Sequence, residues 1–280
     1  MRFCDLHTHS VYSDGTSTPA ELIAGAKEAG LAAIALTDHN TVAGLPPFLD
    51  AAEGSGVKAV PGVEFSTDYG EIELHILALF VKPEHYVHIT ELMDDLLRRK
   101  EESNIALVAA LKGAGYMLDY DEIRGRTPNG QVNRAHIAAE LFRLGYVESV
   151  QDAFKKLLSP KRGLYVPPKR IGSYEAIRFI KSLGAVAVLA HPFLNLDEAG
   201  LRAFLPEAVE AGLDGMETAY SKYSPETTTL AEDIAAEFGL KNSGGSDFHG
   251  GNKPDISIGK GRGDLAIPMK WLEDLRSCAR

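Results

Sequence analysis

Residues 3–10, Phe-Cys-Asp-Leu-His-Thr-His-Ser, join a short apolar run to a pair of histidines. The run over 3–6 predicts a β-strand, and the histidines follow at the point where that strand ends. Alternate residues of an extended chain point to the same side, so His7 and His9 could together chelate one ion. Two histidines at the surface or at the edge of a core would have the same spacing, and this motif alone leaves both interpretations open.

The segments that follow alternate between helical and strand patterns. Thr18 is placed as an N-cap with Pro19 at the first helical position, and Gly30 is placed to end that helix. An apolar run over 31–36 then predicts the second strand. Later apolar runs predict further strands over residues 58–61, 74–80, 185–190 and 215–218. This alternation predicts an α/β fold in which parallel strands are joined by crossover helices.

Residues 84–165 break the alternation. Their apolar residues keep helical spacing in two runs, which comprise Ile89, Met93, Leu96, Leu97, Ile105, Val108 and Leu111, and then Ile137, Leu141 and Leu144. Pro167 and Pro168 mark the point where the strand pattern resumes. We therefore predict a barrel-like body built from residues 1–83 and 166–280, with a helical insertion over residues 84–165.

The composition is that of an ordinary globular protein, with 45% hydrophobic and 24% charged residues in a chain of 280. The formal net charge of −10 offers no basic surface to duplex nucleic acid or to an anionic membrane, so we expect neither as a partner. The two cysteines, Cys4 and Cys278, indicate neither a disulfide framework nor a zinc–thiolate site. Without a secretion signal or an apolar stretch near the roughly 20 residues of a membrane span, the chain is expected to be cytoplasmic.

Acidic residues and histidines recur where the predicted strands end. These residues are Asp38 and His39 after the second strand, Glu64 after the third, His75 at or within the fourth, His191 after 185–190, and Asp247 and His249 among glycines. Six of the nine histidines follow this pattern, and His85, His88 and His136 lie outside it. Each residue alone has an ordinary structural interpretation, such as turn chemistry for Asp14 in Ser-Asp-Gly. Because the carboxyl ends of the strands of an α/β sheet border one crevice, we expect these groups to converge.

Imidazoles and carboxylates without thiolates suit manganese, iron, zinc or related ions. Six imidazoles and several carboxylates exceed what one ion requires, and Glu64 could bridge two ions. Adjacent metal ions acidify a bound water and stabilise charge on the attacking and leaving oxygens. We therefore expect two or three divalent ions in an enzyme that hydrolyses a phosphate ester, and the ligand types leave the choice among Mn²⁺, Fe²⁺ and Zn²⁺ open.

The ordered motifs closely resemble those of the PHP (polymerase and histidinol phosphatase) superfamily of metal-dependent phosphoesterases. They are DLHTHS at 5–10, SDG at 13–15, TDHN at 37–40, GVEFS at 62–66, LHIL at 74–77, AHP at 190–192 and GGSDFHG at 244–250. The resemblance implies a distorted (β/α)7 barrel with a trinuclear metal centre. It implies as ligands His7, His9, Asp14, His39, Glu64, His75, His191, Asp247 and His249. Asp38 would support the ligands or handle a proton.

The insertion resembles that of the branch containing 3′,5′-nucleotide bisphosphate phosphatases and 5′-to-3′ exoribonucleases. Residues 133–138 resemble the Arg-Pro-His-Ile-Ala pattern of that branch, with Ala135 in place of proline, and residues 161–166 resemble its basic and aromatic segment. The insertion is therefore expected to form part of the substrate pocket. Arg134 could grip a phosphate through two hydrogen bonds, and His136 could bind phosphate or protonate the leaving group. A solvated helix start would explain the same two residues.

Lys161, Arg162 and Asp14 are also expected to bind substrate, although Lys161 and Arg162 could equally form a surface basic pair. The leading hypothesis is hydrolysis of the 3′-phosphate of a nucleoside 3′,5′-bisphosphate by metal-bound hydroxide. Stepwise cleavage of short RNA from its 5′ end and hydrolysis of histidinol phosphate are alternatives, and so is a catalytically silent metal-binding module. The expected partner is thus a small phosphorylated nucleotide or a short RNA, and the sequence carries no signal for an oligomeric state.

Overall fold

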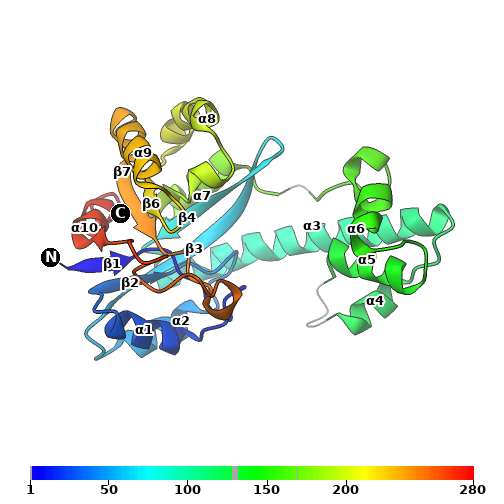
Figure 1. Ribbon diagram of the computed structural model, residues 1–280, viewed down its shortest axis with the longest axis horizontal. Coiled ribbons are helices and arrows are strands. Elements are labelled where there is room, and N and C mark those ends of the chain that lie inside the picture. The colour runs from blue at the N-terminus through cyan, green and yellow to red at the C-terminus, as the bar shows by residue number, and fades with distance from the viewer. Residues whose placement is uncertain (1, 128–131, 169) are drawn as a thin grey trace. The chain divides into compact units, whose positions relative to one another are not determined.

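The computed structural model describes residues 2–127, 132–168 and 170–280 (Figure 1). The chain divides into two compact units. The barrel unit comprises Met1–Thr90 and Ile171–Arg280, and the helical unit comprises Glu91–Arg170. Among the described residues, none of the helices combines the length and the apolar character needed to cross a membrane.

The barrel unit is built on one sheet with the strand order β7-β6-β5-β4-β3-β2-β1-β8. The strands are β1 (Phe3–Asp5), β2 (Ala33–Leu36), β3 (Lys58–Tyr69), β4 (Ile72–Leu79), β5 (Val186–Leu189), β6 (Gly215–Tyr220), β7 (Lys241–Gly245) and β8 (Ile267–Pro268). The sheet curls until β1 approaches β7, where the Leu6 amide donates to the Gly244 carbonyl at 3.2 Å. This nearly closed barrel confirms the predicted α/β barrel fold.

The direction of β4 differs from the predicted parallel arrangement. β4 runs antiparallel to both β3 and β5. A two-residue turn at Gly70, which has a φ of 62°, reverses the chain directly between β3 and β4 without a crossover helix. As a result Glu64 lies inside β3 and not after a strand as predicted. His75 lies within β4, as one of its two predicted positions has it, and pairs with Ser66, two residues beyond Glu64.

The helices of the barrel unit are α1 (Pro19–Glu28), α2 (Leu45–Ala52), α7 (Ser173–Ser182), α8 (Glu198–Ala211), α9 (Pro225–Glu237) and α10 (Met269–Arg276). The predicted start of α1 is confirmed. Thr18 and Glu21 form a capping box, and Gly30 follows the helix at a φ of 72°. Apolar side chains fill the barrel: Cys4, Leu6, Ala33, Ala35, Val60, Leu77, Leu79, Val186, Val188 and Ala190 are all buried. This packing leaves the polar residues to gather at the end of the barrel.

The helical unit has its own core. It contains most of α3 (Tyr86–Gly113), together with α4 (Tyr120–Arg126), α5 (Arg134–Arg143), α6 (Val150–Ala153), a π-helical turn (Phe154–Leu158) and a 3₁₀ turn (Pro160–Arg162). Their apolar faces meet in a cluster formed by Leu107, Val108, Leu111, Leu118, Ile123, Ile137, Ala138, Leu141, Leu157, Leu158 and Tyr165. These helices therefore form a separately packed body over Glu91–Arg170.

Candidate metal centre

The barrel brings together all nine residues that the sequence singled out as metal ligands. The loop after β1 supplies His7, His9 and Asp14, β2 leads to His39, β3 and β4 carry Glu64 and His75, β5 leads to His191, and β7 leads to Asp247 and His249. His191 and Asp247 hold the strained φ values of 28° and 55°. Backbone strain of this kind persists only where the surrounding structure enforces it. Here the His191 amide is bonded to Glu217, and Oδ2 of Asp247 is bonded to Tyr220 and Lys253.

The buried carboxylate of Glu64 lies at the middle of the cluster. Its Oε2 atom lies 3.1 Å from Nε2 of His7 and 3.1 Å from Nε2 of His9. Its Oε1 atom lies 2.8 Å from Nδ1 of His75 and 3.1 Å from Nε2 of His191. The two oxygens of one carboxylate thus face different pairs of imidazoles, an arrangement suited to bridging two cations.

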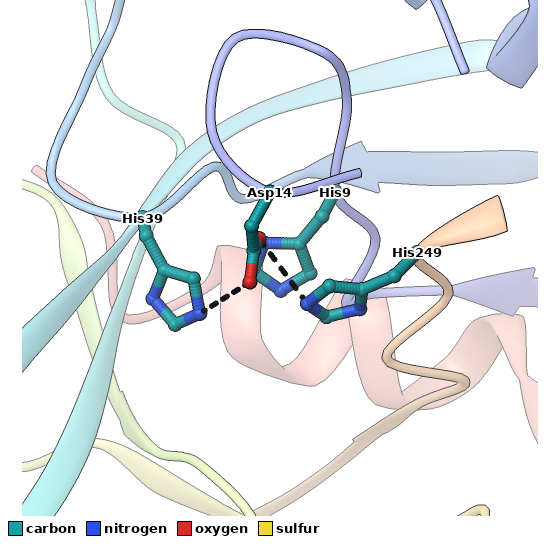
Figure 2. A group of neighbouring side chains, drawn as sticks. All are labelled: His9, Asp14, His39 and His249. Carbon is teal, nitrogen blue, oxygen red and sulfur yellow. Dashed lines mark ion pairs between the residues drawn. The ribbon is translucent and has the colours of Figure 1, made fainter. Parts of the chain in front are cut away.

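Asp14 forms the accessible edge of the cluster. In Figure 2 it lies between His39 and His249, with His9 behind it. Its Oδ1 atom lies 3.2 Å from Nε2 of His249 and 3.6 Å from Nδ1 of His9, and its Oδ2 atom lies 3.9 Å from Nε2 of His39. Its side chain is 54% exposed, whereas that of His9 is fully buried. Asp14 is therefore the member of this group that a substrate could reach most easily.

Asp247 joins the two sides of the cluster. Its Oδ1 atom lies 3.4 Å from Nε2 of His9 and 3.3 Å from Nδ1 of His249. Its Oδ2 atom accepts hydrogen bonds from the Tyr220 hydroxyl at 2.7 Å and from the Lys253 ammonium at 2.6 Å. One oxygen is held by other side chains, so the other remains directed at the histidines.

The cluster has the donors that divalent cations require. Three sets of ligand atoms lie within 4.8 Å of one another: His7, His9 and Glu64; His9, Asp14, His39 and His249; and His39, Glu64 and His75. Among the described residues, the Nδ1 atoms of His9 and His39 are buried and make no hydrogen bond, although they lie 3.6 Å from Oδ1 of Asp14 and 3.3 Å from Oε2 of Glu64, respectively. Burying such atoms is costly unless something pairs with them. Lone pairs on nitrogen and carboxylate oxygen, with no thiolate among them, fit manganese, iron or zinc.

The charges inside the cluster are strongly coupled. Burial alone would raise the pKa of Glu64, but the charges of His7 and His39 hold it well below its usual range. Burial alone would lower the pKa of His75, yet hydrogen bonds to Glu64 and Glu73 raise it to about 9. Burial lowers the pKa of His39 to about 4. The carboxylates thus attract positive charge, which bound cations would supply while displacing protons from the imidazoles.

Glu217 contacts two residues of the cluster, although the sequence did not single it out. It lies within β6 and is fully buried. Its Oε1 atom lies 2.9 Å from Nδ1 of His7, and its Oε2 atom accepts the backbone amide of His191 at 2.7 Å. The signal was present, because a glutamate inside the predicted strand 215–218 is costly unless it is paired. Tyr220 and Lys253, which hold Asp247, carried no comparable signal.

The Asp38 carboxylate accepts hydrogen bonds from the loop that follows β1. Its Oδ1 atom accepts the Ser10 amide at 2.7 Å and the Ser13 hydroxyl at 2.6 Å, and its Oδ2 atom accepts the Ser10 hydroxyl at 2.6 Å. These bonds fasten the loop that carries Asp14. The geometry therefore favours a supporting role for Asp38 over proton transfer.

The remaining substrate-binding candidates lie in the helical unit. The Arg134 guanidinium lies over the Tyr165 ring, 4.5 Å from its centroid, and 5.7 Å from the centroid of Phe154. Nδ1 of His136 accepts the backbone amide of Asn133 at 3.2 Å, which leaves the ring proton on Nε2. His136 is thus a neutral donor within the capping box of α5.

The two other candidates of this unit lie just beyond the π-helical turn. Arg162 is exposed and donates from Nε to the Lys155 carbonyl at 3.2 Å. The Lys161 side chain lies outside the described part of the structure. Arg162 is therefore a surface residue whose guanidinium is held at Nε by the backbone of Lys155.

This chain is similar to known proteins along most of its length. The sequence profile of the PHP domain family matches residues 5–158. A 5′-3′ exoribonuclease of Haemophilus influenzae is 32% identical over 246 residues, which cover 88% of this chain and 89% of the relative. A 3′,5′-nucleoside bisphosphate phosphatase of Chromobacterium violaceum is 30% identical over 261 residues, which cover 92% of this chain and 91% of the relative.

A solved structure has the same fold. A protein from Bifidobacterium adolescentis, described as a metal-dependent phosphoesterase, superposes with a TM-score of 0.70 at 28% identity, over 100% of this chain and 97% of that one. His191, Asp247 and His249 lie beyond the part matched by the family profile, and their contacts with Glu64, His9 and Asp14 join them to it. The chain belongs to the PHP domain family and is a metal-dependent phosphoesterase.

Proposed function

We propose that this enzyme removes the 3′-phosphate from a nucleoside 3′,5′-bisphosphate. The observation that carries the proposal is the buried carboxylate–imidazole cluster around Glu64, with Asp14 exposed at its edge. Such a centre can receive an anionic phosphate despite the net charge of −10, because bound cations reverse the local charge. The choice of substrate is supported by the nearly full-length similarity to the bisphosphate phosphatase of Chromobacterium violaceum.

The proposed ligands are the nine residues of the cluster: His7, His9, Asp14, His39, Glu64, His75, His191, Asp247 and His249. They would hold two or three divalent ions, for which we propose Mn²⁺, with Fe²⁺ or Zn²⁺ as alternatives. When bound, the ions supply an acidified water and neutralise charge on the phosphoryl oxygens. Asp14, with its half-exposed side chain, would also contact the substrate.

The helical unit is proposed to contribute to substrate binding. The rings of Tyr165 and Phe154 orient Arg134, so its guanidinium could grip a phosphate through two parallel hydrogen bonds. His136 could donate its Nε2 proton to the phosphate or to the leaving oxygen. Lys161 and Arg162 would add positive charge. This assignment rests on side-chain chemistry within the helical unit and on the similarity to enzymes that act on phosphorylated nucleotides.

Substitution of Arg134 tests that assignment. We expect Arg134→Ala to raise the KM for the bisphosphate roughly 10- to 100-fold, which corresponds to losing hydrogen bonds to a charged group, while the metal content stays unchanged. Arg143→Ala is a matched control, because Arg143 lies in the same unit and pairs with Glu140. Full activity and an unchanged KM in Arg134→Ala would remove Arg134 from the substrate site.

A second candidate function is 5′-to-3′ cleavage of short RNA, which the Haemophilus influenzae relative favours. In both reactions a nucleophile attacks phosphorus. The two differ mainly in the leaving group and in the length of substrate that the binding site must hold. One metal centre could therefore serve both.

The substrate is decided by parallel kinetics. Mn²⁺-loaded protein is given adenosine 3′,5′-bisphosphate, short 5′-phosphorylated RNA, or histidinol phosphate, and inorganic phosphate and mononucleotide are measured separately. We expect phosphate release from the bisphosphate with the highest kcat/KM. Faster release of mononucleotides from RNA would favour the second candidate. Turnover of histidinol phosphate alone would overturn both nucleotide assignments.

A further inference from the structure

Strand β6 contributes hydrogen bonds to three proposed ligands but no ligand of its own. Glu217 reaches Nδ1 of His7 at 2.9 Å and the backbone amide of His191 at 2.7 Å. Tyr220 donates its hydroxyl proton to Asp247 at 2.7 Å. These partners come from β1, β5 and β7 in sequence, so one strand supports ligands from three others.

A β-bulge allows Glu217 and Tyr220 to act on the same side of the sheet. Residues three apart on a regular strand point to opposite faces. Glu217 pairs with Ser243 and Ala219 pairs with Gly244, so Thr218 is an extra residue that shifts the register. Tyr220 then pairs with Gly245, two residues beyond Ser243, so its side chain lies on the same face of the sheet as that of Glu217. The bulge thus re-aims a side chain, a common role of bulges beside active sites.

Glu217 selects the tautomer of His7. Because a carboxylate only accepts hydrogen bonds, the proton of a neutral His7 must lie on Nδ1. Nε2 is then left with its lone pair, and that atom lies 3.1 Å from Oε2 of Glu64, inside the cluster. The other oxygen of Glu217 holds the backbone of His191 at its strained φ of 28°. One side chain therefore sets the orientation of two ligands.

Tyr220 acts on Asp247 in a similar way. Its hydroxyl and the Lys253 ammonium occupy Oδ2, so Oδ1 is the oxygen that faces His9 and His249. Asp247 itself has a φ of 55°, a conformation that needs support from its surroundings. The hydroxyl of Tyr220 supplies part of that support.

We propose that β6 is a positioning strand, in which Glu217 and Tyr220, brought to one face by the bulge at Thr218, orient His7, His191 and Asp247 for metal binding. The proposal concerns how the ligands are held and is independent of the substrate. Groups that orient ligands commonly change metal affinity by 10- to 100-fold when they are replaced.

The test uses Glu217→Gln and Tyr220→Phe, which keep shape and burial. A glutamine has one acceptor oxygen and one NH₂ group. If the oxygen accepts from His7, the NH₂ group faces the backbone N–H of His191, and the reverse holds if the side chain is flipped, so one of the two bonds must be lost. We expect each variant to bind Zn²⁺ about 10- to 100-fold more weakly in competition with a chelator. Glu140→Gln and Tyr223→Phe are matched controls. Glu140 is a buried glutamate that pairs with arginines of the helical unit, and the Tyr223 hydroxyl accepts the Phe193 amide at 3.0 Å.

A spectroscopic readout separates positioning from general destabilisation. In the Zn²⁺-loaded wild type, ¹⁵N spectra of the histidines should place the proton of His7 on Nδ1, and Glu217→Ala should lose this single tautomer. The proposal would be overturned if Glu217→Gln and Tyr220→Phe both bound Zn²⁺ as tightly as the wild type and if the His7 spectrum of Glu217→Ala were unchanged. If Glu217→Gln does not fold, Tyr220→Phe decides alone: affinity equal to that of Tyr223→Phe would overturn the proposal.

Discussion

The surroundings of Asp38 distinguish a supporting role from proton handling, which its position in the sequence could not separate. Three hydrogen bonds from Ser10 and Ser13 occupy both of its oxygens, and they fix the loop that ends at Asp14. A carboxylate that takes up and releases protons during the reaction would have to give up these bonds. Proton handling by Asp38 stays a prediction, and the geometry weighs against it.

Substitution of Asp38 by asparagine tests this supporting role. The amide group can accept at only one atom, so we expect at least one loop contact to be lost and metal affinity to fall roughly 10-fold. Metal titration and kcat would be measured together, with the exposed Asp50→Asn as a control. A shifted pH–rate profile at full metal affinity would instead support proton handling.

Cys4 predicts how stability should respond to alkaline pH. Burial and the charge of Asp5 raise the pKa of this thiol from 9.0 to about 12. The thiol stays neutral in the folded protein while the unfolded chain ionises, so its contribution to stability is complete below pH 9 and is lost as the pH rises toward 12. We expect Cys4→Ala to show a smaller loss of unfolding free energy between pH 8 and about pH 10 than the wild type does. Equal losses in urea titrations would contradict this account.

At the scale of single elements, α1 is an example of local chemistry that acts as predicted. The Thr18 hydroxyl accepts the Glu21 amide at 3.3 Å, and the Glu21 carboxylate accepts the Thr18 amide at 2.7 Å. Thr18→Ala should therefore lower the unfolding free energy by about 1 kcal/mol, measured by urea denaturation. Thr229→Ala serves as a control in the interior of another helix, where the hydroxyl donates to the Pro225 carbonyl at 3.0 Å. An equal effect of both substitutions would show that the cap contributes nothing specific.

The helix start of α1 and the central residues of the cluster were predictable because they depend on local sequence patterns. Thr18 and Pro19 signal a helix start over four residues, and His7 and His9 follow an apolar run. The antiparallel direction of β4 was not predictable in this way, since the alternation of apolar runs says nothing about strand direction. The role of Glu217 depends on a bulge and on partners more than 25 residues away, at sequence separations of 210 and 26. Such contacts appear only when the strands are assembled.

At the scale of the whole molecule, the barrel gathers more ionisable groups than a stable core normally tolerates. Five imidazoles lie within hydrogen-bond or ion-pair distance of the single buried carboxylate of Glu64: His7, His9, His39, His75 and His191. Without cations, partly protonated imidazoles must balance the carboxylates, and in the described part of the chain the buried Nδ1 atoms of His9 and His39 make no hydrogen bond. The folded barrel is therefore expected to gain stability from metal ions through binding that the unfolded chain cannot reproduce.

Removal of the metal ions should measure that gain. At a free Mn²⁺ concentration 100-fold above the Kd, one bound ion adds about 2.7 kcal/mol to the unfolding free energy, so chelation should lower the Tm by several degrees. Glu64→Gln removes the charge shared by the two sides of the cluster, and its Tm should respond far less to added Mn²⁺. Glu140→Gln, whose partners lie in the helical unit, should keep the full response. If neither chelator nor Mn²⁺ changed the Tm of the wild type, the charge of the carboxylates would already be balanced by protons on the imidazoles. The proposal of a multinuclear metal centre would then have to be abandoned.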